Sequence, residues 1–117
     1  IFKQYSDRTR AQFHCFVDDV ASMRRIIEMG SLVSFTGIVT FKNAEEVRET
    51  ISATPLDKLM LETDSPFLAP VPHRGKRCEP SFTRHVAERV AEMKMVSLDE
   101  LSEVTNATAR AFFSKLA

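Results

Sequence analysis

The sequence has only two cysteines, no excess of charge of either sign and no long apolar run. A membrane-spanning helix needs about 20 consecutive apolar residues, so no membrane span is expected. The sixteen basic and sixteen acidic residues balance, so a site for nucleic acid or another polyanion has to be a local patch. Cys15 and Cys78 stand at an arbitrary spacing, which predicts reduced thiols in a cytoplasmic protein.

The chain also lacks an initiator methionine and a signal peptide, since it opens on Ile1, Phe2 and Lys3. This opening in the middle of a pattern predicts a fragment of a longer protein. The 117 residues are 44% apolar and 27% charged, the composition of a soluble globular domain. No repeat, low-complexity run or linker divides them, so residues 1–117 are expected to form one domain or part of one.

Apolar segments typical of strands alternate with helical patterns along the chain. The predicted strands are 11–17, 32–35 and 56–61. The order β-α-β-α-β-loop-α-α-α predicts an α/β fold with parallel strands and right-handed crossovers. Three strands make a poor closed structure, so they form either an open sheet or the last part of an eight-stranded barrel.

Short-range signals mark the ends of the predicted helices. Residues that can cap a helix N-terminus precede four of the five: Asp18 or Asp19, Asn43, Ser97 and Asn106. Ser97 and Glu100 have the spacing of a capping box, and Gly30 is expected just past the end of the first helix. Residues 65–80 hold four prolines, one glycine and a basic cluster, and a loop of this length in a compact domain is usually functional.

Two polar residues fall where α/β proteins place their chemistry, at the C-terminal ends of strands. His14 lies late in the first predicted strand, and Asp64 lies just past the third. Imidazole and carboxylate are a normal ligand set for a divalent metal ion. Taken alone, however, His14 also fits a hydrogen-bonded core or edge residue, and Asp64 fits a helix cap or a turn.

Three longer motifs bear on that choice. They are FHCF at 13–16, SFTGIVTFKNAEEVRE from Ser34 and LMLETDSPFLAPVPHRGKRCEP from Leu59. Together they resemble the TatD family of metal-dependent deoxyribonucleases. The resemblance implies a (β/α)8 TIM barrel of the metal-dependent hydrolase type, with residues 1–117 as a partial TatD-like domain, the C-terminal part with about the last three strands and helices. It also implies a site with two divalent ions, of which zinc, magnesium and manganese are not distinguished.

By that resemblance, His14 is a metal ligand on strand six of the barrel. Asp64 is the metal ligand on strand eight and the catalytic residue that orients the attacking water. A divalent ion lowers the pKa of bound water from 15.7 toward about 7, and a neighbouring carboxylate can accept a proton as a general base. The implied substrate is DNA, as a single strand or at 3′ ends, and no obligate protein partner is evident.

Three further residues have both a functional and a structural interpretation. Glu62 shares a strand face with Asp64 and is predicted either to orient a ligand or a bound water or to pair with a lysine or arginine. His73 and Arg74 are predicted to contact substrate phosphates; the alternative is a solvated loop or salt bridges. His85 is expected to be structural.

The remaining ligands of the family are missing from this sequence. It contains three histidines, none in an HxH pair, and neither the bridging glutamate nor the strand-five histidine of the family is present. Two ligands cannot hold two ions tightly, so the chain by itself is expected to be inactive. The alternatives are a metal-dependent hydrolase of another substrate on the same scaffold and a non-catalytic truncated product.

Overall fold

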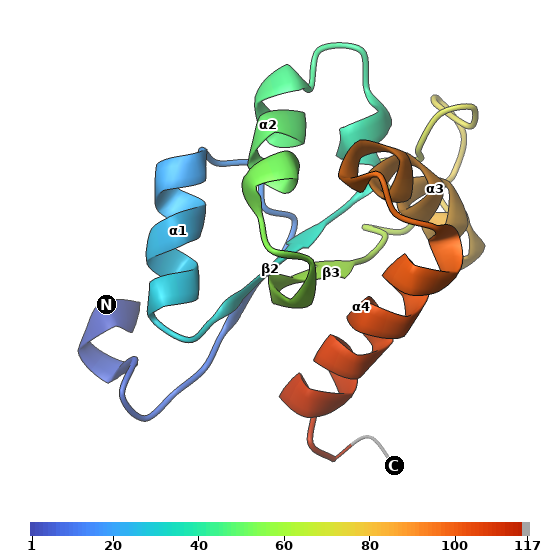
Figure 1. Cartoon of the computed structure of the whole chain (residues 1–117). Helices are drawn as coiled ribbons and strands as arrows, with labels where there is room; N and C mark the ends of the chain where they lie inside the picture. The colour runs from blue at the N-terminus through green and yellow to red at the C-terminus, as the bar shows by residue number, and fades with distance from the viewer. Residues whose placement is uncertain (116–117) are drawn as a thin grey trace.

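The computed structural model describes residues 1–115 and contains a three-stranded parallel sheet (Figure 1). The strands are β1 (Gln12–Phe13), β2 (Leu32–Phe35) and β3 (Leu59–Leu61), and their order in the sheet is β1-β2-β3. Both pairings are parallel, as the alternation of strands and helices predicts. The C-terminal ends of all three strands therefore lie at one edge of the sheet.

One α-helix follows each of the first two strands, and two α-helices follow the third. They are α1 (Val20–Glu28), α2 (Glu45–Ala53), α3 (Thr83–Lys94) and α4 (Leu98–Phe112). Each contacts the next along the chain, α1 with α2, α2 with α3 and α3 with α4. One short 3-10 helix, Phe2–Tyr5, precedes β1, and three others lie between these elements at Gly37–Thr40, Leu56–Lys58 and Pro80–Phe82. Within residues 1–115, no helix is long and apolar enough to cross a membrane.

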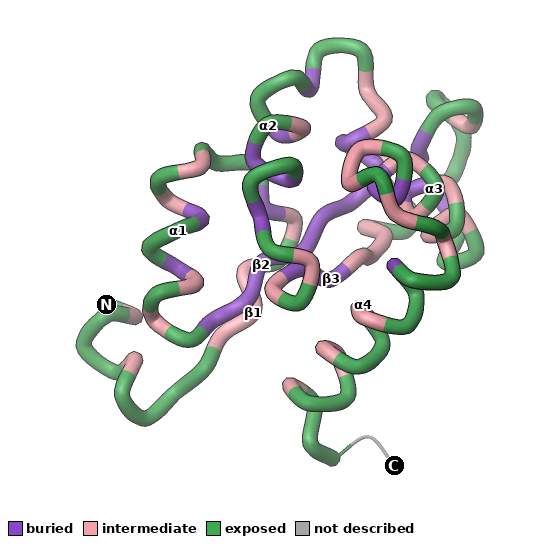
Figure 2. Tube along the Cα trace, in the orientation of Figure 1, coloured by how far each residue is buried: buried purple, intermediate pink, exposed green. Residues whose placement is uncertain are grey.

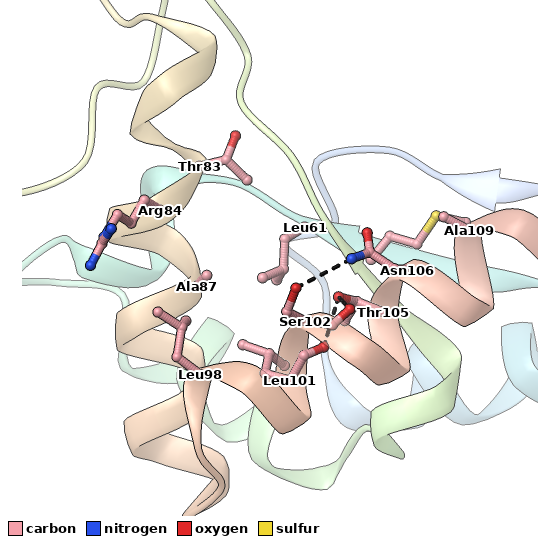
Figure 3. Close-up of a pocket in the computed structure, with 11 residues that line it drawn as sticks. Leu61, Thr83, Arg84, Ala87, Leu98, Leu101, Ser102, Thr105, Asn106 and Ala109 are labelled. Atoms are coloured by element: carbon pink, nitrogen blue, oxygen red, sulfur yellow. Dashed lines mark hydrogen bonds between the residues drawn. The ribbon is translucent and has the colours of Figure 1, made fainter.

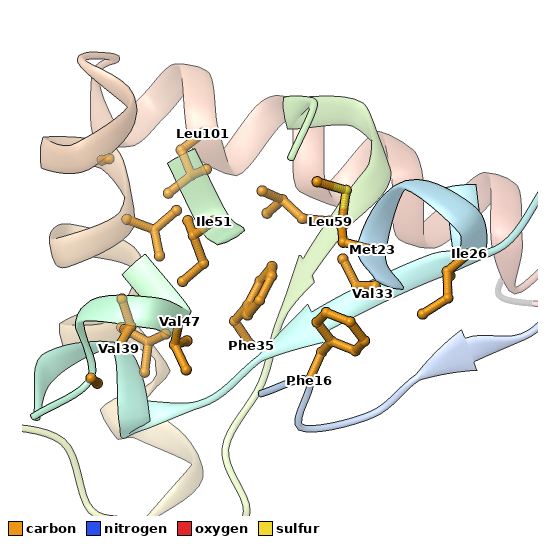
Figure 4. Close-up of a cluster of buried hydrophobic side chains, with 14 residues drawn as sticks. Phe16, Met23, Ile26, Val33, Phe35, Val39, Val47, Ile51, Leu59 and Leu101 are labelled. Atoms are coloured by element: carbon orange, nitrogen blue, oxygen red, sulfur yellow. The ribbon is translucent and has the colours of Figure 1, made fainter. Parts of the chain in front are cut away.

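The hydrophobic core lies between the helices and one face of the sheet (Figure 4). The register pairs Val33 with Leu59 and Phe35 with Leu61, so these four side chains share that face. The helices contribute a set of aliphatic side chains to the cluster: Met23, Ile26, Val47, Ile51, Val86, Val90 and Leu101. All four residues of β2 are buried, as the tube coloured by burial shows (Figure 2), which is typical of a strand in a parallel sheet.

Two of the predicted strands are shorter than the sequence indicates. The first covers Gln12–Phe13 rather than 11–17, because the backbone turns at Cys15, whose φ of 47° lies in the left-handed region. His14 therefore lies just past β1 rather than inside it. The third strand begins at Leu59 rather than at Leu56, because the residues after Pro55 form a 3-10 turn.

The helix ends follow local signals at two places. Asp19 caps α1 by accepting a 2.8 Å hydrogen bond from the Ser22 N–H. Ser97 caps α4 by accepting a 3.0 Å bond from the Glu100 N–H. Gly30, with a φ of 71°, follows the C-cap of α1 as expected.

Two other cap predictions are wrong. Asn43 does not cap α2, whose N-cap is Ala44 without a side-chain hydrogen bond. Asn106 lies inside a continuous α4 and donates from Nδ2 to Ser102 Oγ at 3.2 Å. Two α-helices rather than three therefore follow the loop, because an asparagine inside a helix can bond along the helix surface instead of starting a new one.

The segment 62–79, here called the basic loop, leaves the end of β3 and packs against the 3-10 helix Gly37–Thr40. The Val71 N–H donates to Thr40 Oγ1 at 2.9 Å, and Ala69 and Pro70 are buried. A Cβ added to Gly37 would lie 2.4 Å from the Leu68 carbonyl oxygen. The loop is therefore structured, and its docking requires a residue without a side chain at position 37.

Candidate functional site

The turns after β1 and β3 are joined through Glu62. Its Oε2 lies 2.5 Å from Nδ1 of His14, and its Oε1 accepts a 2.7 Å hydrogen bond from the Cys15 N–H. The Glu62 side chain is only 16% exposed, and its partner is a histidine rather than a lysine or arginine. One carboxylate thus holds both the imidazole ring and the backbone that carries it.

This contact fixes which nitrogen of His14 faces the surface. A neutral ring that donates its Nδ1 proton to Glu62 keeps the lone pair on Nε2. Nε2 lies 3.6 Å from Oδ1 of Asp64, and the His14 and Asp64 side chains are 56% and 41% exposed. A histidine whose second nitrogen is held by a carboxylate is the usual arrangement of metal-binding histidines.

Asp64 is held by a tight turn at the start of the basic loop. Its carbonyl oxygen accepts a 2.7 Å hydrogen bond from the Phe67 N–H, and its side chain is partly exposed. Asp64 and His14 together offer one oxygen and one nitrogen donor to a divalent ion, so the donor set fits part of a metal site. Among residues 1–115, no group of three or more histidine, cysteine, aspartate or glutamate side chains is arranged to hold an ion.

The two basic-loop residues predicted to bind phosphate are packed against aromatic rings. The His73 ring stacks on Phe82, with 4.2 Å between ring centroids, and its Nε2 lies 3.1 Å from Nε2 of His85. The Arg74 guanidinium lies 3.8 Å from the centroid of the Phe41 ring. The structure therefore brings His14, Glu62 and Asp64 together but shows no contact from His73 or Arg74 to them, and the phosphate role stays a prediction.

Several contributors to the site carry no recognisable signal in the sequence. The left-handed backbone at Cys15 directs an N–H toward Glu62, and a non-glycine residue with this conformation cannot be identified from a hydrophobic pattern.

The two cysteines are free thiols, Cys78 buried and Cys15 half-buried, as the sequence predicts. His73 and His85 are both visible in the sequence, but their contact across the loop and α3 is not.

A groove of about 390 Å³ lies elsewhere, between β3 and the helices α3 and α4 (Figure 3). Apolar side chains from these elements, including Leu61, Ala87 and Leu98, point into it. His14, Glu62 and Asp64 do not line this groove, so it is not the place where the ligand-type side chains meet.

Parallel strands with polar side chains beyond their C-terminal ends are the arrangement in which α/β enzymes place their functional groups. The family model for TatD related DNase matches residues 1–114, so the chain belongs to the TatD family. The resemblance predicted from the sequence motifs is thereby confirmed.

Individual relatives agree with this assignment. The uncharacterized metal-dependent hydrolase YcfH of Escherichia coli K12 is 50% identical over 92 residues, which cover 79% of this chain and 35% of the relative. YabD of Bacillus subtilis, also described as an uncharacterized metal-dependent hydrolase, is 43% identical over 100 residues, 86% of this chain and 39% of the relative. The chain therefore spans about a third of the length of these curated relatives.

The fold is also found in solved structures. The crystal structure of YJJV, a TatD homolog from E. coli K12, matches with a TM-score of 0.87 over 96% of this chain and 43% of that chain, at 24% identity. A TatD family hydrolase from Entamoeba histolytica matches with a TM-score of 0.78. At these identities the likeness establishes the fold alone.

Proposed function

We propose that residues 1–117 are the C-terminal part of a (β/α)8 barrel, and that the complete protein is a metal-dependent hydrolase that cleaves phosphodiester bonds in DNA. The observation that carries the proposal is the placement of His14 and Asp64 beyond the two outer strands, with Nε2 and Oδ1 3.6 Å apart. In barrels of this type, the catalytic groups stand at this end of the strands.

The three residues have separate roles in this proposal. His14 Nε2 and an Asp64 oxygen hold a divalent ion, zinc, magnesium or manganese, while Glu62 orients the His14 ring. When bound, the ion supplies Lewis-acid stabilisation and makes its water more acidic. Asp64 also accepts a proton from the attacking water, because its carboxylate stands at the site and is partly exposed. The remaining ligands come from parts of the protein outside these 117 residues.

A local positive patch supports a phosphate-bearing substrate. Residues 73–84 contain four arginine or lysine residues and one glutamate, a net charge of +3 with histidine neutral, although the whole chain is neutral. Arginine can bind a phosphate through two parallel hydrogen bonds, and Arg74 is exposed while it stacks on Phe41. Phosphate contacts contribute much of the affinity of proteins for nucleic acid.

Phe67 supports a nucleic acid rather than a smaller phosphate ester. Phe67 is 68% exposed, although its N–H is bound to the Asp64 carbonyl and Ala69 and Pro70, two and three residues further along the loop, are buried. An exposed ring three residues from Asp64, on a fixed loop, suits stacking against a base, which contributes about 1–3 kcal/mol in single-strand binding. The proposed substrate is therefore single-stranded DNA or a 3′ end.

The non-catalytic alternative for the chain by itself has a specific observation in its favour. In the described residues, the one carboxylate beside His14 and Asp64 is that of Glu62, which is engaged with His14 Nδ1 and the Cys15 N–H, and no group of three or more ligand-type side chains is arranged to hold an ion. The 117-residue chain alone is therefore expected to show no metal-dependent cleavage of DNA, and the activity is assigned to a protein in which the barrel is complete.

The test is a chimera in which residues 1–117 replace the matching segment of the E. coli relative YcfH. We expect the folded chimera to cleave a 3′-labelled single-stranded oligonucleotide when a divalent ion is present. Asp64→Asn should lower the rate by roughly 10²–10⁴-fold, while Asp57→Asn, an exposed aspartate before β3, should leave it unchanged.

Each other result has a defined meaning. A folded chimera that is inactive while YcfH cuts DNA would overturn the proposal for this chain. Full activity of Asp64→Asn would overturn the assigned role of Asp64. If both proteins leave DNA intact but hydrolyse another ester in a metal-dependent way, the protein is a metal-dependent hydrolase of another substrate on the same scaffold, and the nuclease proposal is wrong.

A further inference from the structure

We propose that His73 and His85 form a second metal site, which binds a transition-metal ion such as Zn²⁺ through their two Nε2 atoms and fixes the basic loop to α3. His73 lies in the basic loop, and His85 lies in the first turn of α3. The site shares no residue with His14, Glu62 and Asp64.

The distance between the two nitrogens fits one shared ion. The Nε2 atoms are 3.1 Å apart. Two nitrogens bound to one ion at about 2.05 Å are separated by about 2.9 Å at a right angle and by about 3.3 Å at the tetrahedral angle. The observed separation lies between these values, so an ion can replace the hydrogen bond without a large movement of either ring.

The tilt of the rings fits the same geometry. Two imidazoles joined by a straight Nε2–H···N hydrogen bond would have their centres about 5.4 Å apart at this N–N distance. The observed centroids are 4.9 Å apart, with an interplanar angle of 57°. Two rings that point at one ion, with this N–N separation, have centres about 4.8 Å apart, so the observed centroid distance is compatible with shared coordination.

Both histidines are held in place before any ion binds. The His73 ring stacks on Phe82 at an interplanar angle of 10°, and its backbone N–H donates to the Pro70 carbonyl at 2.7 Å. Nδ1 of His85 lies 3.7 Å from Oε2 of Glu88, one helical turn further along. At this distance the carboxylate faces Nδ1 without a formed hydrogen bond, and its closer approach on metal binding would favour the tautomer whose lone pair is on Nε2.

The surroundings decide which ion is accepted. Arg84 donates from Nε to the other oxygen of Glu88 at 2.9 Å, so that carboxylate is already paired with a guanidinium. Magnesium and calcium prefer oxygen ligands, whereas the two groups offered here are imidazole nitrogens. Zinc, nickel, cobalt and copper bind imidazole well, with water completing a site of two protein ligands.

This site has a consequence for the proposed nuclease. Arg74 directly follows His73, so an ion at the pair would immobilise the residue proposed to contact phosphate. This consequence rests on the proposed function, whereas the metal site itself does not.

The test uses the 117-residue chain with His14→Gln, in which His73 and His85 are the remaining histidines. Zinc ions are titrated while the imidazole nitrogens are followed by long-range proton–nitrogen NMR. We expect both Nε2 resonances to shift together and to saturate at one ion per chain, whereas magnesium should produce no such shift. His73→Phe, which keeps a ring to stack on Phe82, and His85→Gln should each weaken zinc binding by about tenfold or more.

The opposite results are equally clear. If zinc shifts neither or only one Nε2 resonance, the pair is a hydrogen bond and the proposal is wrong. If His73→Phe and His85→Gln, folded by circular dichroism, bind zinc as the parent does, the proposal is also wrong. Because His14 is absent and no cleavage is measured, these outcomes leave the nuclease proposal unaffected.

Discussion

Glu62 and His14 are 48 residues apart in the sequence, yet the Glu62 carboxylate lies 2.5 Å from Nδ1 of the imidazole. The same carboxylate accepts the Cys15 N–H, so it fixes both the orientation of the ring and the turn that carries it. We therefore expect Glu62 to control the affinity for a metal ion at His14 without being a ligand itself.

The first prediction concerns this carboxylate. Glu62→Gln keeps an oxygen for the Cys15 N–H but removes the charge next to Nδ1. We expect the affinity of the YcfH chimera for zinc or manganese to fall by roughly 10–100-fold, measured by calorimetric titration, with little change in thermal stability. Glu46→Gln, an exposed glutamate on α2, is the control. An unchanged affinity in Glu62→Gln would show that His14 does not need this partner.

Phe67 gives a prediction about substrate binding. Phe67→Ala removes an exposed ring whose backbone is held by Asp64, so the fold should be unaffected. We expect the chimera to bind single-stranded DNA more weakly by about 1–3 kcal/mol, measured by fluorescence anisotropy at fixed salt, while Phe67→Trp should retain binding. Val71→Ala, which shortens another exposed apolar side chain of the loop, serves as control, and equal losses in both variants would contradict base stacking.

Asp19 gives a prediction about pH. The hydrogen bond from the Ser22 N–H holds the pKa of the Asp19 carboxyl below its ordinary value of 3.8. Because the folded-state pKa is lower than the unfolded one, the stabilisation is present above pH 3.8 and is lost as the pH falls through the lowered value.

Urea unfolding of Asp19→Ala and of the unaltered chain checks this expectation. At pH 7 the variant should unfold at a lower urea concentration, because α1 loses its N-cap. The difference between the two urea midpoints should shrink as the pH falls below 3.8 and through the lowered pKa of Asp19. Asp7→Ala, which removes an exposed aspartate near the N-terminus, is the control variant. A difference in urea midpoint between Asp19→Ala and the unaltered chain that stays constant down to low pH would contradict the capping role.

Gly37 determines how the basic loop docks. In Gly37→Ala the new Cβ would meet the Leu68 carbonyl at 2.4 Å and the Pro70 nitrogen at 3.0 Å, both of them backbone atoms that cannot rotate away. We expect a loss of stability of about 1–3 kcal/mol and faster proteolytic cleavage within residues 62–79. Gly30→Asn is the control, because a Cβ there meets nothing within 4 Å and asparagine tolerates the left-handed conformation. Unchanged proteolysis in Gly37→Ala would mean that the loop does not depend on this contact.

The sequence by itself determined the features that depend on local patterns. The β2 strand at residues 32–35 and the caps of α1 and α4 at Asp19 and Ser97 are as predicted. These features are readable because hydrophobic spacing reports which face of an element is buried, and a capping side chain bonds within its own first turn. The long motifs were specific enough to identify the TatD family, and they place His14 and Asp64 near strand ends.

Only the tertiary structure decided which distant groups meet. The pairing of β1 with β2 and of β2 with β3 brings Glu62 to His14, and the packing of the basic loop against α3 brings His73 to His85. Tertiary contacts also end β1 at Phe13, because the Cys15 N–H bonds to Glu62 instead of to a neighbouring strand. The helix α4 likewise continues through Asn106. Contacts of this kind depend on strand register and on the close packing of separate elements, which no local pattern in the sequence encodes.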